Sequence, residues 1–238
     1  MLDFSQFEVF TFDCYGTLID WEAGILRALV PLLQKYRVDA SDEEVLESYA
    51  EAETRAESQP FKPYRRVLAQ VVDELGVKFG FNPTNDEREV LAGSIRTWPP
   101  FPDTVTALRR LHDRYKLSII SNIDDDLFQQ TAKLLQVPFD YVTTALEVGS
   151  YKPSVNNFHR ALQKMNIAKE RVLHVAQSLH HDVEPARQLG ICSVWVNRRQ
   201  GKSGGGATVT SAVRPDLEVP DLKTLADLAV GSQKAAIG

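Results

Sequence analysis

The sequence predicts an α/β fold in which helices cover a parallel β-sheet. Short β-rich runs alternate with amphipathic helical runs, which is the pattern of strands joined by helical crossovers. One long stretch near the N-terminus breaks this alternation and carries helical periodicity only. The length of 238 residues fits one large domain, or a core domain that carries a smaller inserted one.

Five runs are predicted to be strands because they are rich in β-branched and aromatic residues. They cover residues 8–13, 117–121, 141–144, 172–175 and 193–196. The helical runs cover residues 104–115, 126–135, 154–165, 182–189 and 222–229.

The interruption lies between residues 21 and 96, where apolar residues such as Ile25, Leu29 and Leu32 recur at helical spacing. An all-helical insertion after the first strand of such a sheet is a natural cap. The proline-rich segment 98–102 marks the return to the core, because proline ends helices. We therefore expect a core of residues 1–17 and 98–238 and a helical cap domain of residues 18–97.

The composition excludes several classes of protein. A formal net charge of -5 and a pI near 5.6 give no electrostatic footprint for nucleic acid or for a membrane surface. The N-terminus does not resemble a secretory signal or a transit peptide, and no apolar stretch is long enough to cross a bilayer. The two cysteines, Cys14 and Cys192, provide neither a disulfide framework nor zinc-ligand spacing. We expect a cytoplasmic protein without nucleic-acid or membrane partners.

Polar residues follow the predicted strands, and ligands of an open parallel sheet bind at the carboxyl ends of its strands. These residues are Asp13, Tyr15 and Thr17 after the first strand, Ser121 and Asn122 after the second, Lys152 after the third, and Gln177, Ser178, His181 and Asp182 after the fourth.

This set is suited to nucleophilic catalysis by a carboxylate. Asp13 can attack carbon or phosphorus to form an ester or acyl phosphate, which water then hydrolyses. The ammonium of Lys152 would keep Asp13 ionised and oriented. Thr17, Ser121 and Asn122 are candidates for holding a substrate carboxylate or phosphate. Asp182 is the candidate base for the hydrolytic water.

Four of these segments, in order, resemble the motifs of the haloacid dehalogenase (HAD) superfamily. They are Phe12-Asp13-Cys14-Tyr15-Gly16-Thr17-Leu18, Ser121-Asn122, Lys152-Pro153 and the run from Gln177 to Asp182. The resemblance covers nearly the whole chain and implies a Rossmann-like HAD core with Asp13 as nucleophile.

Two positions bear on the branch of the superfamily. Its metal-dependent phosphatases carry an aspartate two residues after the nucleophile, where this chain has Tyr15, and an acidic metal ligand where it has Gln177. Magnesium prefers anionic oxygen ligands. The chain instead resembles the type II L-2-haloacid dehalogenases. That likeness implies cleavage of a carbon–halogen bond in a small 2-substituted carboxylic acid, with no metal and no cofactor.

Other positions depart from the dehalogenases. Their cap arginine has no clear counterpart here, although Arg55, Arg65 and Arg66 are candidates, and Phe158 replaces a tyrosine. Asp20-Trp21-Glu22 and the segment from Ser178 to Asp182 are also similar to L-azetidine-2-carboxylate hydrolase, which opens a ring at a carbon–nitrogen bond. Trp21, Tyr15, Asn122, Gln177, Ser178 and His181 are predicted to contact substrate. A magnesium-dependent phosphatase, a non-catalytic HAD-fold protein and a homodimer stay open as alternatives.

The acidic run Asp124-Asp125-Asp126 is not predicted to bind a metal. Carboxylates at this position are explained by capping of the helix that begins near Asp126 and by its macrodipole.

Overall fold

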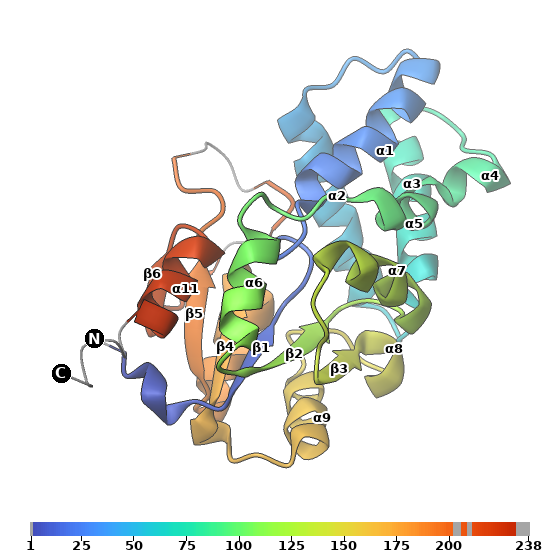
Figure 1. Ribbon diagram of the computed structural model, residues 1–238. Coiled ribbons are helices and arrows are strands. Elements are labelled where there is room, and N and C mark those ends of the chain that lie inside the picture. The colour runs from blue at the N-terminus through green and yellow to red at the C-terminus, as the bar shows by residue number, and fades with distance from the viewer. Residues whose placement is uncertain (1, 202–205, 209–210, 232–238) are drawn as a thin grey trace.

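The structure is a computed structural model that describes residues 2–201, 206–208 and 211–231. Its centre is a six-stranded parallel sheet in the order β3-β2-β1-β4-β5-β6 (Figure 1). This is the strand order of a Rossmann-like fold, in which the order reverses between β1 and β4. The predicted α/β class with a parallel sheet is confirmed.

The five predicted strands are all present, with boundaries shifted by a residue or two. They are β1 (Val9–Phe12), β2 (Lys116–Ser121), β3 (Tyr141–Thr144), β4 (Val172–Ala176) and β5 (Cys192–Val196). A sixth strand, β6 (Leu217–Val219), was not predicted. Its three residues pair in parallel with β5 at one edge of the sheet, and three residues are too few to show periodicity.

Helices cover both faces of the sheet, because alternate residues of each buried strand point to opposite sides. Phe10 of β1 belongs to the larger apolar cluster, and its neighbour Val9 belongs to a second one on the other face. The first face is covered by α6 (Thr104–His112) and α11 (Leu222–Gly231), and the second by α9 (Val155–Met165) and α10 (Glu184–Leu189). Two further helices follow β2 and β3, namely α7 (Asp125–Leu135) and α8 (Ala145–Val148).

Residues 21–97 contain only helices, which gather on one side of the sheet (Figure 1). We call this segment the helical insert. It consists of α1 (Trp21–Lys35), α2 (Asp42–Glu57), α3 (Tyr64–Phe79), α4 (Asn85–Arg88), α5 (Val90–Ser94) and the 3₁₀ turn η2 (Ile95–Thr97). Two further 3₁₀ turns lie at Phe4–Gln6 and Lys169–Arg171.

Local sequence explains where these helices begin. The carboxylate of Asp20 accepts the backbone N–H of Ala23 at the start of α1, and Ser41 caps α2 in the same way. Thr84 and Glu87 form a reciprocal capping box at α4.

Asp124 does not cap its own helix as predicted. Its two carboxylate oxygens accept the backbone N–H groups of Tyr64 (2.7 Å) and Arg65 (2.9 Å), at the start of α3 in the helical insert. Pro63 precedes α3 and makes no side-chain capping bond, so the carboxylate of Asp124 satisfies two N–H groups that would otherwise lack partners. Capping is therefore the correct interpretation, but the capped helix was wrong, because the two segments are 60 residues apart.

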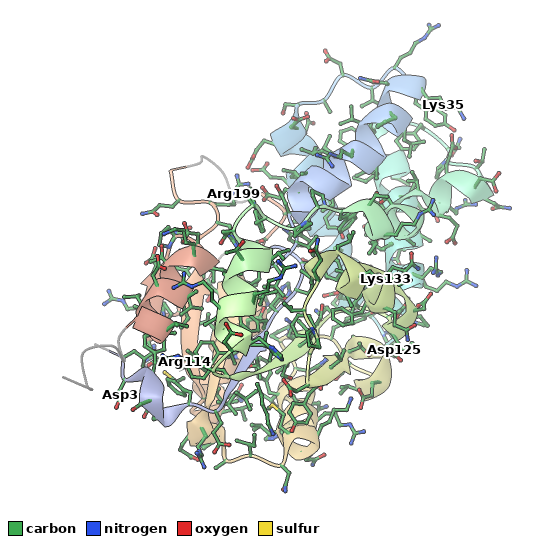
Figure 2. The ribbon with its side chains drawn as sticks, viewed as in Figure 1. Asp3, Lys35, Arg114, Asp125, Lys133 and Arg199 are labelled. Atoms are coloured by element: carbon green, nitrogen blue, oxygen red, sulfur yellow. The ribbon has the colours of Figure 1, made fainter. Side chains whose placement is uncertain are left out.

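A second polar connection joins the insert to the loop after β5. Arg199, labelled in Figure 2, lies in this loop. It donates to both carboxylate oxygens of Glu22 at 2.7 Å and to Glu43 at the start of α2. The backbone N–H groups of Gly206 and Ala207 bond to the same two glutamates. Within the described residues, no helix is both long and apolar enough to cross a membrane.

Candidate active site

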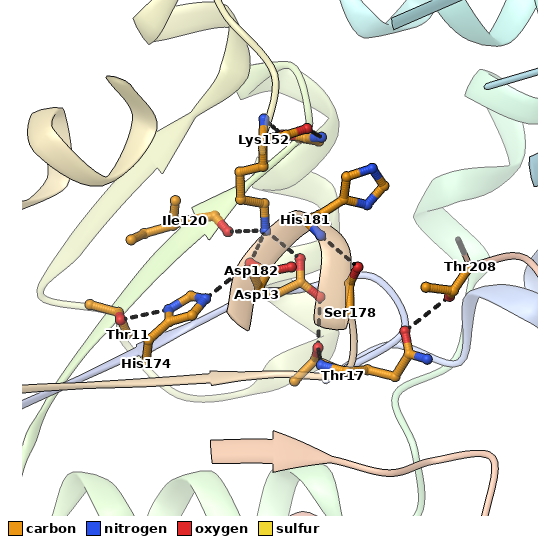
Figure 3. A network of polar contacts seen from close by, with 12 residues as sticks. Thr11, Asp13, Thr17, Ile120, Lys152, His174, Ser178, His181, Asp182 and Thr208 are labelled. Atoms are coloured by element: carbon orange, nitrogen blue, oxygen red, sulfur yellow. Dashed lines mark hydrogen bonds and ion pairs between the residues drawn. The ribbon is translucent and has the colours of Figure 1, made fainter. Parts of the chain in front are cut away.

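Asp13 lies at the point where the strand order reverses. It directly follows β1, and its backbone N–H bonds to Val175 of β4 at 3.1 Å. Its side chain is buried (7% exposed), and the Thr17 hydroxyl donates to its Oδ2 at 2.6 Å (Figure 3). Thr17 in turn accepts the backbone N–H of Gln177 at 2.8 Å. The loops after β1 and β4 are thereby joined through the hydroxyl that orients the predicted nucleophile.

The turn after Asp13 depends on a glycine. Gly16 has a φ of 91°, a left-handed conformation that residues with a Cβ rarely adopt. A Cβ at this position would lie 3.0 Å from Nε1 of Trp21 and 3.2 Å from Oε1 of Gln177. The glycine thus allows both side chains to close over the turn that carries Asp13 and Thr17.

Lys152 joins the two buried aspartates of the core. Its Nζ donates to Oδ1 of Asp13 at 2.9 Å, to Oδ1 of Asp182 at 2.6 Å and to the carbonyl of Ile120 at 2.9 Å (Figure 3). An ammonium has three donors, so all of them are used. Burial alone would lower the pKa of Lys152, but the two carboxylates outweigh it and raise the pKa. Lys152 is therefore a permanent cation.

The two aspartates differ in their electrostatics. Burial raises the pKa of Asp13, and Lys152 opposes this increase. For Asp182, burial also raises the pKa, but Lys152 and a hydrogen bond from His174 outweigh it and lower the pKa overall. Asp182 is consequently the more strongly stabilised anion of the pair.

Asp182 reaches the site from an unusual turn. Residues Leu179–Val183 (η4) form a π-helix, in which the N–H of Val183 bonds to the carbonyl of Ser178, five residues earlier. A π-helix accommodates one additional residue per turn and is frequent at functional sites. The hydroxyl of Ser178 accepts the N–H of His181 at 3.0 Å and so caps this turn. This turn thus places Asp182 within hydrogen-bonding distance of Lys152.

Ser121 and Asn122 lie at the end of β2. The side chain of Asn122 accepts the backbone N–H of Lys152 at 2.7 Å and donates to its carbonyl at 3.1 Å, which fixes the backbone around the lysine. The hydroxyl of Ser121 is buried and has no hydrogen-bond partner among the described residues. A buried hydroxyl without a partner is available to a ligand.

The helical insert contributes two carboxyl groups that the sequence analysis did not identify. Glu53 and Glu57 of α2 line the same cavity as Asp13, together with Tyr64 of α3. Oε1 of Glu53 accepts hydrogen bonds from the hydroxyls of Tyr49 (2.8 Å) and Tyr64. Both oxygens of Glu57 lie 3.4 Å from the amide nitrogen of Asn122. The signal that was missed is the spacing of Tyr49, Glu53 and Glu57, which puts three polar groups on one face of a helix.

Burial raises the pKa of both glutamates. Burial raises the pKa of Glu53 to about 7, although the hydrogen bonds from Tyr64 and Tyr49 oppose it. Burial, followed by the charge of Glu53, raises the pKa of Glu57 well above its ordinary value. In the described part of the chain neither glutamate forms an ion pair, whereas Asp13 and Asp182 both pair with Lys152.

The other predicted site residues line this cavity, with differing roles for their side chains. Trp21 packs edge-on against Tyr49, with ring centroids 6.0 Å apart. The hydroxyl of Tyr15 points to Thr131 of α7 at 2.8 Å, so only its ring faces the cavity. Gln177 accepts from Thr208, and burial lowers the pKa of His181 to about 4, which keeps that ring neutral.

None of the three arginines considered for leaving-group binding lines the cavity. Arg55 pairs with Glu74 on the exposed side of the insert, Arg65 pairs with Glu89 and Asp126, and Arg66 is exposed. Helical spacing cannot reveal which face of α2 or α3 points inward, and here the arginines lie on the outer faces. Among the described residues that line the cavity, Lys152 is the only lysine or arginine.

The residues do not fit the magnesium site of a phosphatase. The ammonium of Lys152 occupies Oδ1 of both Asp13 and Asp182, which leaves fewer carboxylate oxygens for a cation. Gln177 supplies an amide whose oxygen is engaged by Thr208, and Tyr15 turns its hydroxyl away. A hard divalent cation prefers several anionic oxygens around one point, which this arrangement does not offer.

Comparisons with known proteins identify the family of this chain. A model of the haloacid dehalogenase-like hydrolase family matches residues 7–190. A glyceraldehyde 3-phosphate phosphatase of Methanothermobacter thermautotrophicus is 34% identical over 103 residues, 41% of this chain and 45% of that enzyme, so the chain spans less than half of its length. An (S)-2-haloacid dehalogenase of Pseudomonas putida is 26% identical over 206 residues, 80% of this chain and 84% of that enzyme.

The fold has close structural neighbours. The structure of L-2-haloacid dehalogenase from Xanthobacter autotrophicus with covalently bound chloropropionic acid aligns with a TM-score of 0.78, covering 94% of this chain and 99% of that one. At 20% identity this likeness concerns the fold alone. The family match spans the first four strands of the sheet, β1 to β4, and includes Asp13, Lys152 and Asp182. The chain therefore belongs to the haloacid dehalogenase-like hydrolase family.

Proposed function

We propose that this hydrolase breaks a carbon–nitrogen bond at the α-carbon of a small cyclic amino acid, as in the ring opening of L-azetidine-2-carboxylate. The observation that carries the proposal is the pair Glu53 and Glu57, two carboxyl groups without an ion-pair partner in the described structure that share a cavity with Asp13. A protonated ring nitrogen would supply the missing positive charge. It would also favour the ionised form of both glutamates.

The chemistry begins with displacement at carbon. An oxygen of Asp13 attacks the α-carbon as the carbon–nitrogen bond breaks, and the bonding electron pair goes to nitrogen. The protonated ring thereby opens to a primary amine, and Asp13 carries the product as an ester. Glu53 and Glu57 hold the nitrogen, and the free hydroxyl of Ser121 is suited to the substrate carboxylate.

The second step regenerates the enzyme. Asp182 accepts a proton from water, and the oxygen of that water attacks the carbonyl carbon of the Asp13 ester. The bond between this carbon and the ester oxygen then breaks, and the product leaves as a 2-hydroxy acid with an amino group. Lys152 remains charged throughout and stabilises the two aspartates that it contacts.

Dehalogenation of a 2-haloacid is the second candidate. It is supported by the similarity to an (S)-2-haloacid dehalogenase over most of both chains. The insert side of the cavity argues against it. Halide is a weakly basic anion, and ionised Glu53 or Glu57 would repel it, whereas a nitrogen leaving group benefits from both the negative charge and the available proton. The mismatch of the magnesium ligands leaves phosphatase activity as the least supported alternative.

A single-turnover experiment in H₂¹⁸O tests the proposal. Enzyme in excess is mixed with L-azetidine-2-carboxylate, with each enantiomer of 2-chloropropionate, or with p-nitrophenyl phosphate and magnesium. We expect one ¹⁸O atom in the peptide that contains Asp13 after reaction with the azetidine, because water attacks the ester carbonyl. Labelling with a chloropropionate alone would instead establish the dehalogenase. Phosphate release that EDTA abolishes would establish the phosphatase.

A further inference from the structure

A buried histidine approaches Asp182 from the side away from the cavity. His174 lies in the middle of β4 and is fully buried. Its Nε2 lies 2.9 Å from Oδ1 of Asp182, and its Nδ1 lies 2.9 Å from the hydroxyl of Thr11 in β1 (Figure 3). None of the roles assigned above uses this residue, although it contacts the predicted base directly.

Packing fixes the orientation of the imidazole ring. Thr11 and His174 are paired in the register of β1 and β4, so their side chains lie next to each other on the same face of the sheet. The ring of Phe158 from α9 packs edge-on against the imidazole, with centroids 4.9 Å apart and an interplanar angle of 75°. The imidazole is held between two strands and a helix, and its two nitrogens have defined partners.

These partners define which atoms donate. A carboxylate only accepts hydrogen bonds, so the proton on Nε2 of His174 points to Asp182, and in a neutral ring Nδ1 then accepts the hydroxyl proton of Thr11. Oδ1 of Asp182 therefore accepts from both His174 and Lys152. The other oxygen, Oδ2, is buried and has no partner among the described residues. The carboxylate is thus anchored through one oxygen, and the second is left for a proton.

We propose that His174, supported by Thr11, is the positioning residue for Asp182 in hydrolysis of the ester. By holding Oδ1, it directs Oδ2 to accept the proton of the attacking water. The proton moves from water to Asp182, the water oxygen bonds to the Asp13 carbonyl carbon, and the ester oxygen leaves with the product and recovers that proton. This inference rests on the proposed function only in requiring an ester on Asp13, whatever the leaving group.

Measuring ester formation and ester hydrolysis separately distinguishes a positioning role of His174 from a merely structural one. His174→Phe keeps an aromatic ring but removes the donor, and His174→Gln keeps a donor that can reach Asp182. We expect His174→Phe to slow hydrolysis of the ester about 10- to 100-fold, because a charge-assisted hydrogen bond is lost, and to change ester formation by less than about threefold. Intact-mass measurement after rapid quenching should show the ester accumulating in His174→Phe and much less in His174→Gln. An equal loss in both steps, or wild-type partitioning in His174→Phe, would overturn the proposal.

Thr11→Val provides a milder variant in case His174→Phe folds poorly, and we expect ester accumulation in the same direction but smaller. A measurement independent of substrate separates failure of this inference from failure of the proposed function. ¹⁵N NMR of histidine-labelled protein should place the His174 proton on Nε2, with a resonance that shifts in Asp182→Asn. A proton on Nδ1 would contradict the arrangement even if no tested substrate reacts. If wild type turns over none of the substrates but the Nε2 proton is found, the proposed function fails and the anchoring of Asp182 stands.

Discussion

The two sides of the cavity treat their carboxyl groups differently. On the sheet side, Asp13 and Asp182 share the ammonium of Lys152, and each also accepts a further hydrogen bond. On the side of the helical insert, the hydrogen bonds that Glu53 and Glu57 accept within the described structure come from tyrosine hydroxyls and an amide. On the sheet side a cation of the protein pairs with both carboxylates, whereas on the insert side no ion pair is formed within the described residues.

This difference indicates which part of the reaction each side serves. A neutralised and immobilised carboxylate is prepared to act as nucleophile or base, because it needs no rearrangement before reaction. A carboxyl with a raised pKa is instead prepared to change its charge when a ligand arrives. Under the proposed function, the sheet side carries formation and hydrolysis of the ester, and the insert side binds the leaving group.

Replacing the nucleophile Asp13 should have the largest effect on turnover, and it changes only the sheet side of the cavity. We expect Asp13→Asn to reduce turnover of any true substrate by at least about 1,000-fold, because an amide does not form the ester. No ¹⁸O should enter the variant residue in a single turnover. The matched control is Asp3→Asn, an exposed carboxylate at the N-terminus, which should match wild type. Wild-type activity of Asp13→Asn would contradict covalent catalysis and favour the non-catalytic alternative for this site.

Neutralising the insert side should have the next largest effect and should depend on the substrate. For the azetidine substrate, we expect Glu53→Gln with Glu57→Gln to raise KM about 10- to 100-fold, because two charged partners of the ammonium become neutral amides. The same variant should not lose reactivity toward 2-chloropropionate, which has no cation at that position. Steady-state kinetics with both substrates measure the difference.

Glu51→Gln is the control for that pair, since Glu51 lies on α2 but pairs with Lys78 on the surface of the insert. It should leave KM for the azetidine unchanged. If the double variant binds the azetidine as well as wild type does, the two glutamates are not the cation site.

The sequence predicted the sheet side far better than the insert side. Asp13, Thr17, Lys152 and Asp182 could be placed because the ends of parallel strands converge whatever the loops do. Two other contacts could not be predicted in this way, because they depend on segments that are distant in the sequence. The side chain of Asn122 bonds to the backbone of Lys152, and the hydroxyl of Tyr15 points away from the cavity.

The insert side escaped prediction for a physical reason. Helical spacing places Glu53 and Glu57 on one face of α2 but does not say whether that face meets solvent or the sheet. Arg55 and Arg65 were candidates for the cap arginine of the dehalogenases, yet both side chains form ion pairs on the outer faces of the insert. Likewise, the strand β6 and the cap that Asp124 provides for α3 arise from pairings between segments far apart in the sequence.

Measuring kcat/KM as a function of pH distinguishes the two sides of the cavity. The pKa of Glu53 on the insert side lies near 7, whereas Lys152 on the sheet side stays charged. With a pKa of about 7, Glu53 is mostly protonated at pH 6 and mostly ionised at pH 8. We expect kcat/KM for the ammonium substrate to rise about tenfold over this range, following the ionised fraction in the free enzyme. Glu53→Gln should remove this rise, and a persistent rise in the variant would assign it to another group.

The raised pKa of Glu53 can also be tested without substrate, by thermal or urea unfolding at several pH values. A carboxyl whose folded pKa is raised from 4.5 to about 7 binds its proton more tightly in the folded state. Its contribution to stability is therefore complete below about pH 4.5 and is lost as the pH rises through 7, with a slope of up to about 1.4 kcal/mol per pH unit. The difference in unfolding free energy between wild type and Glu53→Gln should change in this direction across that range.

The smallest effect is expected for the arginines on the outer faces of the insert. Arg65 forms ion pairs with Glu89 and Asp126 and is itself substantially exposed, so Arg65→Ala should cost less than about 1 kcal/mol of stability. Arg55→Ala, which breaks the exposed pair with Glu74, should behave in the same way. Neither should change kcat/KM by more than about twofold for either substrate, since neither side chain lines the cavity. If one of them selectively abolishes reaction with 2-chloropropionate, that arginine must reach the cavity when substrate binds. The insert would then resemble a halide-binding cap more than a cation-binding one.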